Sequence, residues 1–406
     1  MGNLRLSVPV TSSQSEVLYN PPSCYLETCA LRPRRSVFYH STRNHALGES
    51  GRARCIINVS VDPEIAFHRF FQELEPPPIL IRPEDPDNRR YKGKKDLNTL
   101  PTDVRILLSA FQQSFNEALS NEKKDVPEHV DHPPFHFDYI DSDIPNAIAF
   151  QYQDYSFIGI TVALVGQLWM TCERLSRNLA VAAILRVRLP SDEYQRLHAI
   201  LFRIQLSFII SHEYTHHVHG HVAGREWESP FSSEIIDAGL RGNLDQQIWE
   251  TDADGYAAYH VLANLIGGAD RSHAIGVLKL EREDEAIQDE ILLSCFVAAI
   301  GAYLFVRPPV SLDETSVYRF THPPQAARMN SLMNQAINWC KQNRQPLSAW
   351  MTPERFEILM RSVAEATWGM NGGTDWSAQV EFFESNAGSE YVRTLEQSLK
   401  AYIEGL

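Results

Sequence analysis

The sequence predicts an α+β fold that is mainly helical and contains one small antiparallel sheet. After residue 161, apolar residues recur at helical spacing through most of the chain. Residues 135–161 differ, because they are rich in aromatic and β-branched side chains that partly alternate with polar ones. The chain shows no internal repeat and no glycine-rich phosphate loop. We therefore expect a helical protein with one short stretch of sheet in its first half.

Helical periodicity, proline and charge divide the chain into three predicted parts: an N-terminal segment at 1–100, a main domain at 101–345 and a C-terminal helical segment at 346–406. Helix N-caps are expected at Thr102, Ser191 and Asn243. The predicted elements are strands at 56–61, 135–141 and within 146–161, helices at 63–74, 102–122, 162–187, 191–221, 243–266, 284–306, 323–343 and 352–368, and a linker from Pro76 to Leu100.

Length and charge limit the classes of partner. The 406 residues carry a formal net charge of -14, which argues against a general nucleic-acid binder, so we expect a protein or peptide partner. The sequence does not indicate an oligomeric state. An excess of arginine near the N-terminus indicates either a basic arm or a solvated tail. These arginines are Arg32, Arg34, Arg35, Arg43, Arg52 and Arg54.

Neither the N-terminus nor the apolar runs predict export or a membrane span. The first residues have no apolar segment behind a basic start, so they do not resemble a signal peptide. The apolar runs 156–170 and 291–306 are shorter than the roughly 20 residues that cross a bilayer, and they predict buried elements instead. The six cysteines are scattered without a CxxC pair, as in reduced cytoplasmic proteins. We expect a cytoplasmic location.

The stretch ISHEYTHHVHGH, residues 210–221, holds five histidines and predicts a metal site. In a helix, His212 and His216 lie on one face, where both imidazoles can bind one Zn²⁺. Glu213 lies close enough to reach a metal-bound water without being a ligand. The preceding run, 199–210, is apolar almost all round, so the helix is expected to be buried and its polar groups need partners. The alternative is a histidine-rich helix end near the negative end of the helix dipole.

A catalytic zinc site uses three protein ligands plus water, so this pair needs a third ligand. The extended pattern HExxHxxGxxH does not fit, since His219 and Val222 stand where it has Gly and His. Glu250 is the preferred ligand, because Asp254 one turn on can accept a hydrogen bond from a ligand imidazole. Glu234 is the rival ligand. A third alternative is that Glu250 is an ordinary surface residue.

These residues resemble the gluzincin metallopeptidases, and within them the M48 family. Four stretches match in order: HExxH followed by His221, Glu250-Thr-Asp-Ala-Asp254 as an ExxxD element, 143–165 as an Asn-Ala segment with a strand pair and helix, and 321–333 as a late His-Pro motif with a downstream Arg. Many members of the family are membrane proteins, whereas this chain shows no convincing span. Its terminal segments match no part of the family, so substrate identity does not carry over.

The resemblance implies a gluzincin-like zinc endopeptidase that hydrolyses peptide bonds by Glu-assisted attack of zinc-bound water, and the lack of a convincing span predicts that it is soluble. One Zn²⁺ per chain would be held by His212, His216 and Glu250. Glu213 would act as the general base, and Asp254 would fix a ligand imidazole.

The resemblance also implies residues that contact the substrate. Asn146 and Ala147 would belong to an edge strand that pairs with an extended peptide. His322 and Arg328 are candidates to stabilise the oxyanion. The alternatives are that His322 only starts a helix and that Arg328 pairs with a core carboxylate. The remaining histidines of the cluster are expected around the metal site or at the surface, and none is a predicted primary ligand: these are His217, His219 and His221.

Two other functions remain open from the sequence. One is a non-hydrolytic, zinc-stabilised regulatory or interaction module, in which the metal only ties helices together. Glu213 argues against it, because a structural site needs no base and would be closed by a fourth ligand. The other is a toxin- or defence-type protease specific for one host protein. It differs from a general endopeptidase in substrate breadth, which one sequence does not show.

Overall fold

The computed structural model describes residues 61–73, 91–125, 133–188, 190, 193–222, 244–306, 311–368 and 377–405. The predicted basic arm, the strand at 56–61, most of the linker and the rival ligand Glu234 lie outside the described residues. The described chain groups into two compact units. One contains the described part of Tyr25–Ser142 together with Phe150–Gly159, and the other contains Asp143–Ala149 and Ile160–Leu406.

The smaller unit is held together by aromatic side chains. Phe67 contacts Phe150 and Phe157 at ring-centroid distances of 5.6 Å and 5.5 Å, and Phe70 stacks on Phe150 at 4.0 Å. Asn116 ties a helix to a strand, because its side chain bonds both the N–H and the carbonyl of Phe137. The elements are α1 (Pro63–Glu73), a short 3₁₀ turn (Leu97–Thr99), α2 (Thr102–Asp125) and β1 (Phe135–Ile140), with parts of β2 (Ala147–Tyr152) and β3 (Tyr155–Thr161).

The three strands form one sheet in the order β1-β3-β2. A two-residue turn joins β2 to β3 as an antiparallel hairpin, with Gln153 in the left-handed region at φ 46°. β1 instead runs parallel to β3, since the N–H of Ser156 at the start of β3 donates to the carbonyl of Pro134 just before β1, at 3.0 Å. The prediction of a mainly helical α+β fold with a small sheet is confirmed, but the sheet is mixed rather than wholly antiparallel. Alternation of apolar residues does not distinguish the two pairings.

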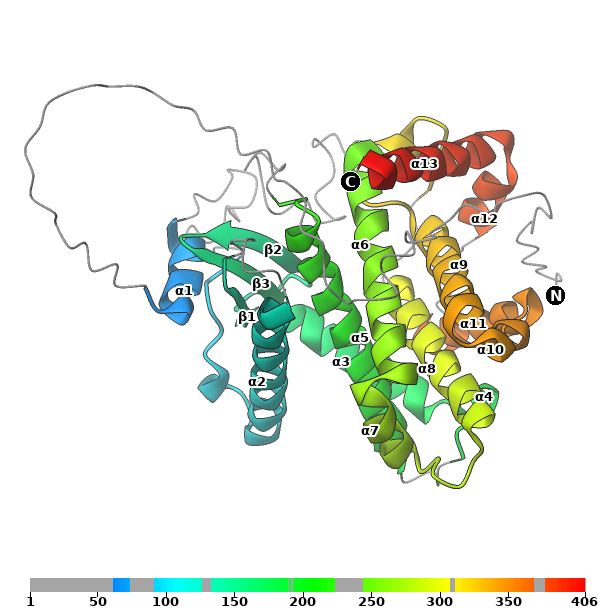
Figure 1. Cartoon of the computed structure of the whole chain (residues 1–406), viewed down its shortest axis with the longest axis horizontal. Helices are drawn as coiled ribbons and strands as arrows, with labels where there is room; N and C mark the ends of the chain where they lie inside the picture. The colour runs from blue at the N-terminus through cyan, green and yellow to red at the C-terminus, as the bar shows by residue number, and fades with distance from the viewer. Residues whose placement is uncertain are drawn as a thin grey trace, which may run out of the picture. The chain divides into compact units, whose positions relative to one another are not determined.

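The larger unit is a bundle of helices around α5. Residues 197–217 of this helix are almost all buried, as its apolar sequence predicts. Figure 1 shows α6 lying along α5, and α13 lying across the N-terminal half of α6. Ala253, Ala257 and Ala258 of α6 are fully buried, which allows this close approach. The elements are α3 (Val162–Arg177), α4 (Leu179–Ile184), α5 (Tyr194–Val218), α6 (Leu244–Leu262), a π-helical turn (Ala263–Gly267), α7 (Ala269–Leu278), α8 (Glu285–Phe305), a 3₁₀ turn (Ser316–Tyr318), α9 (Gln325–Asn343), α10 (Gln345–Trp350), α11 (Pro353–Trp368), α12 (Ser377–Glu384) and α13 (Asn386–Gly405).

Most predicted helices are present, with two differences that arise from capping. The helix predicted over 162–187 is divided into α3 and α4, because the side chain of Asn178 accepts hydrogen bonds from the N–H groups of Ala180 and Val181 and so starts a new helix. The helix predicted over 191–221 ends at Val218, and Gly220, at φ 76°, turns the chain back. The last histidines of the cluster therefore lie in a turn rather than on the helix.

Helix α8 is the one described helix that is long and apolar enough to cross a membrane, at 21 residues. It contains the apolar run 291–306 that the sequence predicts to be buried. In its most apolar window, 78% of the residues are buried inside the protein. The core helix of a soluble protein meets the same criteria of length and composition.

Candidate metal centre

Helix α5 carries the two histidines of the HExxH motif into the interior. His212 and His216 are 7% and 2% exposed, and Glu213, between them in sequence, is also buried. Their spacing of four residues puts both rings on one face of the helix. The Nε2 atoms of the two rings lie 3.1 Å apart. Both imidazoles therefore present a nitrogen to the same point.

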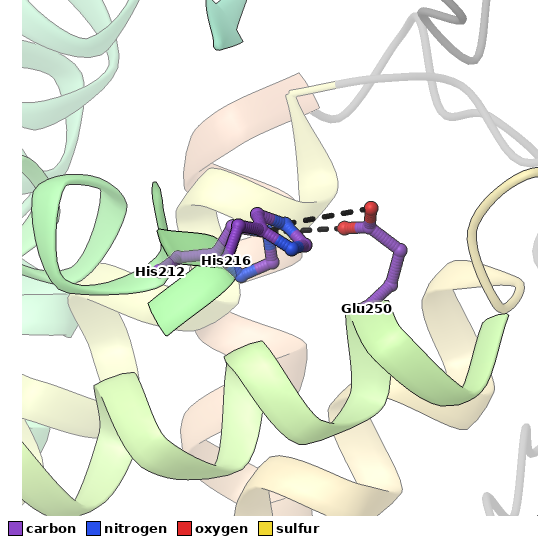
Figure 2. A group of neighbouring side chains, drawn as sticks. All are labelled: His212, His216 and Glu250. Carbon is purple, nitrogen blue, oxygen red and sulfur yellow. Dashed lines mark hydrogen bonds and ion pairs between the residues drawn. The ribbon is translucent and has the colours of Figure 1, made fainter. Parts of the chain in front are cut away.

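Helix α6 brings a carboxylate to that point, as Figure 2 shows. Oε2 of Glu250 lies 3.0 Å from Nε2 of His212, and Oε1 lies 3.5 Å from Nε2 of His216. The three ligand atoms lie within 4.8 Å of one another. Glu250 is 4% exposed, which rules out the alternative of an ordinary surface residue. Glu234, the rival, lies outside the described residues.

One turn along α6, Asp254 contacts the opposite side of a ligand ring. Its Oδ1 lies 3.0 Å from Nδ1 of His212. Arg328 on α9 pairs with the same carboxylate through two nitrogens, at 2.8 Å and 2.9 Å. The sequence predicted the contact between Asp254 and a ligand imidazole, and it left the pairing of Arg328 with a core carboxylate as an alternative.

Glu250 and Asp254 surround His212 with negative charge. Burial lowers the pKa of His212, but hydrogen bonds to Asp254 and Glu250 outweigh it and raise that pKa to about 10. Burial raises the pKa of Glu250, but the neighbouring charges of His322 and His216 hold it well below its ordinary value. Burial also raises the pKa of Asp254. The charge of Arg328, together with the contact to His212, outweighs burial and lowers that pKa to about 2. Two buried carboxylates thus stabilise a positive charge at His212.

The donor set fits a zinc ion. In the neutral tautomer of His212 whose Nδ1–H donates a hydrogen bond to Asp254, Nε2 has a lone pair. This Nε2 faces both Nε2 of His216 and the carboxylate of Glu250. Converging lone pairs and a carboxylate in a buried site are stable only around a positive charge. Two imidazoles and one carboxylate are a ligand set that catalytic zinc uses, with one position left for water.

A pocket opens beside this cluster and gathers most of the other predicted residues. It is lined by His212 and Glu213 of α5, Asn146 and Ala147 at the start of β2, His322 and Arg328, with Leu164, Phe208, Ile209 and Tyr303 as its other walls. Nε2 of His322 lies 3.1 Å from Oε2 of Glu250, and its Nδ1 lies 2.9 Å from the hydroxyl of Thr321. His322 also lies three residues before the start of α9, so the helix-start alternative describes its place as well.

Asn146 is held in the pocket wall by Thr161. The N–H of Asn146 donates to the hydroxyl of Thr161 at 2.9 Å, and the N–H of Thr161 donates to the carbonyl of Asn146 at 2.9 Å. The same hydroxyl accepts the N–H of Leu164 at 3.2 Å and caps α3. One threonine thus joins the start of the edge strand to the first turn of the next helix. Thr161 was not among the residues predicted from the sequence.

A second group of polar residues lies next to the ligands: His219 and His221, which were expected around the metal site or at the surface, and Asp252, which was not predicted from the sequence. His221 is 1% exposed, and its Nδ1 lies 2.9 Å from Nδ1 of His216. Asp252 is fully buried and contacts both His219 and His221. These interactions hold the pKa of Asp252 well below its ordinary value despite burial, which acts in the opposite direction. Burial lowers the pKa of His221. Three acidic residues alternating at 250, 252 and 254 were the local signal of Asp252.

The model of peptidase family M48 matches residues 113–336, which is more than half of the chain and includes both α5 and α6. No curated protein and no solved structure matched the chain in the corresponding comparisons.

Proposed function

Since this chain belongs to peptidase family M48 and is a metallopeptidase, we propose that it is a soluble endopeptidase that cleaves internal peptide bonds with Glu213 as its general base. The observation that carries the proposal is that Glu213, the ligand histidine His212 and the edge-strand residue Ala147 line one pocket. An acid–base group, a metal ligand and a backbone that can align a peptide are what this reaction needs in one place.

His212, His216 and Glu250 would hold one Zn²⁺ per chain. When bound there, zinc supplies a Lewis acid that makes water more acidic and polarises the peptide carbonyl. Asp254 would keep the proton of His212 on Nδ1, which leaves Nε2 free to bind the metal. Arg328 balances the charge of Asp254, so that the carboxylate stays ionised in the interior.

Glu213 would take a proton from the attacking water and return it to the nitrogen of the leaving amine. Its position one residue after His212 on the same buried helix supports this role, because the helix holds the carboxylate at a constant distance from the ligands. Solvent is partly excluded there, since Glu213 is 7% exposed.

The substrate would lie along β2 in extended form. β2 is at the edge of the sheet, so its outer backbone groups can pair with a peptide strand. Asn146 and Ala147 begin this edge and line the pocket, which supports their role in substrate binding.

Of the two candidates for the oxyanion, His322 is favoured. Two nitrogens of Arg328 already bind Asp254, whereas His322 lies at the pocket beside Glu250.

A soluble, cytoplasmic protein is part of the proposal. The burial of α8 within the helical unit supports a core helix over a membrane span. The described cysteines Cys172, Cys295 and Cys340 are free thiols, which is usual in a reducing compartment. Recovery of the full-length protein in the membrane pellet after high-speed centrifugation, and its release only by detergent, would contradict this part.

The test combines metal content with turnover. Purified wild-type protein should contain one zinc per chain by mass spectrometry and should cleave some member of a mixed peptide library. Glu250→Ala should lose the zinc, and Glu234→Ala, the rival ligand, should keep it. Glu213→Gln should keep zinc and lose turnover by a factor of roughly 10² or more.

The remaining alternatives give different results in the same experiment. A non-hydrolytic module would bind zinc but cleave no peptide, and Glu213→Gln would then change nothing measurable. A toxin- or defence-type protease would leave the peptide library intact and cleave one protein in a host extract, with the same dependence on Glu213. A wild-type protein that binds no zinc when the metal is offered would end the proposal.

A further inference from the structure

The turn after α5 folds His221 back onto a metal ligand. The N–H of Val222 donates to the carbonyl of His216 at 3.1 Å, and the N–H of Gly220 donates to the carbonyl of His217 at 3.1 Å. Gly220 has a φ of 76°, a conformation that glycine adopts without strain. The ring of His221 thereby comes to lie with its Nδ1 2.9 Å from Nδ1 of His216.

The other nitrogen of His221 faces two hydrogen-bond acceptors. Its Nε2 lies 2.9 Å from the hydroxyl of Tyr402 and 3.3 Å from Oδ2 of Asp252. The hydroxyl of Tyr402 is 3.4 Å from the carbonyl of His219, to which it can donate its own proton. Trp249 stacks on the ring of His221 at 5.8 Å between centroids and encloses it further. Tyr402 belongs to α13, in the C-terminal segment to which the sequence assigns no role.

These contacts determine where the protons lie. An ionised carboxylate only accepts, and a tyrosine whose proton is given to a carbonyl also accepts, so Nε2 of His221 must carry a proton. In the neutral ring, Nδ1 of His221 then has a lone pair. Nδ1 of His216 must therefore be the donor in the contact between the two rings. Nε2 of His216 is left with its lone pair directed at His212 and Glu250.

We propose that His221 is a positioning residue that fixes the tautomer of the metal ligand His216, and that Tyr402 helps to hold His221 in the required state. The C-terminal helix α13 would then be part of the metal centre rather than a separate attachment. This inference rests on the proposed zinc site. Asp254 contacts the ligand His212 directly and fixes its tautomer. Asp252 would fix the tautomer of His216 indirectly, through its contact with His221.

The same residues invite a different interpretation as a second metal site, because ligand atoms of His219, His221 and Asp252 lie within 4.8 Å of one another. The proton count argues against it. A metal on Nε2 of His221 would need the proton of that ring on Nδ1, directed at His216. Nδ1 of His216 would then have to accept, and its Nε2 would carry the proton that zinc must displace. Occupancy of the second site would therefore oppose occupancy of the first.

The experiment uses two pairs of matched variants in the full-length protein, with the zinc dissociation constant measured by competition with a chromophoric chelator. His221→Leu and His221→Asn have similar shapes, but only the Asn oxygen lies near the position of Nδ1 and can accept the proton of His216. His221→Leu should weaken zinc binding by about 10- to 100-fold, and His221→Asn should restore most of that loss.

The second pair compares two tyrosines of α13. Tyr402→Phe removes the hydroxyl that faces His221 and should weaken zinc binding by up to about tenfold. Tyr391→Phe removes a hydroxyl that donates to Gln247, a residue that is not a ligand, and should leave zinc affinity close to that of wild type.

Two-bond ¹H–¹⁵N correlation spectra give a readout that is independent of affinity and activity. His221 should carry its proton on Nε2 in wild type, and a second tautomer should appear in Tyr402→Phe.

Each contrary result has a distinct meaning. Equal weakening by His221→Leu and His221→Asn would mean that the ring only packs, and unchanged affinity in His221→Leu would also overturn the inference. A proton on Nδ1 of His221 in the zinc-loaded protein, or a second zinc that His221→Leu removes, would overturn it in favour of the second site. If wild type binds no zinc at all, the proposed function fails as well. If wild type binds one zinc tightly and the variants bind it with the same affinity, only this inference is overturned.

Discussion

Arg328 holds Asp254 through a two-point ion pair in the interior of the helical unit. The guanidinium Nε lies 2.8 Å from Oδ2 and Nη2 lies 2.9 Å from Oδ1, and the side chains are 6% and 2% exposed. Asp254 also contacts Nδ1 of His212 at 3.0 Å. Guanidinium, carboxylate and ligand imidazole thus form one series that joins α9 to α5 through α6.

Loss of this arginine should destabilise the protein. Arg328→Met keeps much of the aliphatic side chain but leaves Asp254 without its main countercharge, which costs about 3–5 kcal/mol for a buried pair. Urea unfolding of the metal-free protein, followed by circular dichroism, measures the change. Arg393→Met is the control, because Arg393 and its partner Glu390 are more than half exposed, and that substitution should leave the urea midpoint almost unchanged. Equal effects of the two substitutions would show that the buried pair contributes no more than a surface pair.

The metal-free protein should lose stability as the pH rises above neutrality. The pKa of His212 is raised from 6.5 to about 10 in the folded state. A raised pKa means that the folded state binds the proton more tightly, so the contribution is fully present below pH 6.5 and is lost as the pH approaches 10. Urea midpoints between these pH values, in the presence of a chelator, should fall in wild type. His212→Gln should show a flatter dependence, and an identical slope in both proteins would contradict the assignment to His212.

Zinc binding should release a proton from His212. Because the metal-free protein holds that proton up to about pH 10 and a metal ligand must be neutral, the ion has to displace it at neutral pH. Isothermal titration calorimetry at pH 7.5 in buffers of different ionisation enthalpy counts the protons released. About one proton per zinc is expected for His212, and affinity should rise with pH. A release of zero would mean that His212 is already neutral before the metal binds.

Thr161 should affect substrate binding more than the chemical step. Thr161→Val keeps the shape but removes the hydroxyl that accepts from the N–H groups of Asn146 and Leu164, and we expect a loss of about 1–2 kcal/mol in stability. The start of β2 should become less ordered, so KM for a peptide should rise, while kcat should change little because Glu213 lies on α5. Thr367→Val is the control, since that hydroxyl donates only to a carbonyl within its own helix. A fall in kcat at constant KM would contradict this division.

The helices were predictable where local signals act alone. The apolar run before His212 predicts a buried helix, and Asp284 caps α8 by accepting the N–H of Ile287. The break at Asn178 was missed, because an asparagine within an apolar periodic stretch can lie inside a helix or cap a new one. The parallel pairing of β1 was also missed, since alternation of side chains describes one strand and not its neighbour.

The sequence by itself determined the pair His212 and His216 and the nearby base Glu213, because these residues are neighbours on one helix and their geometry follows from the helical repeat. Only the tertiary structure decided that Glu250, 38 residues further on, reaches His212, and that Tyr402, 181 residues after His221, contacts it. The physical reason is that such contacts depend on how buried helix faces pack and on which buried polar groups must be paired. Those are properties of the folded interior. The spacing of Glu250 and Asp254 made Glu250 the preferred ligand, but it could not show the contact itself.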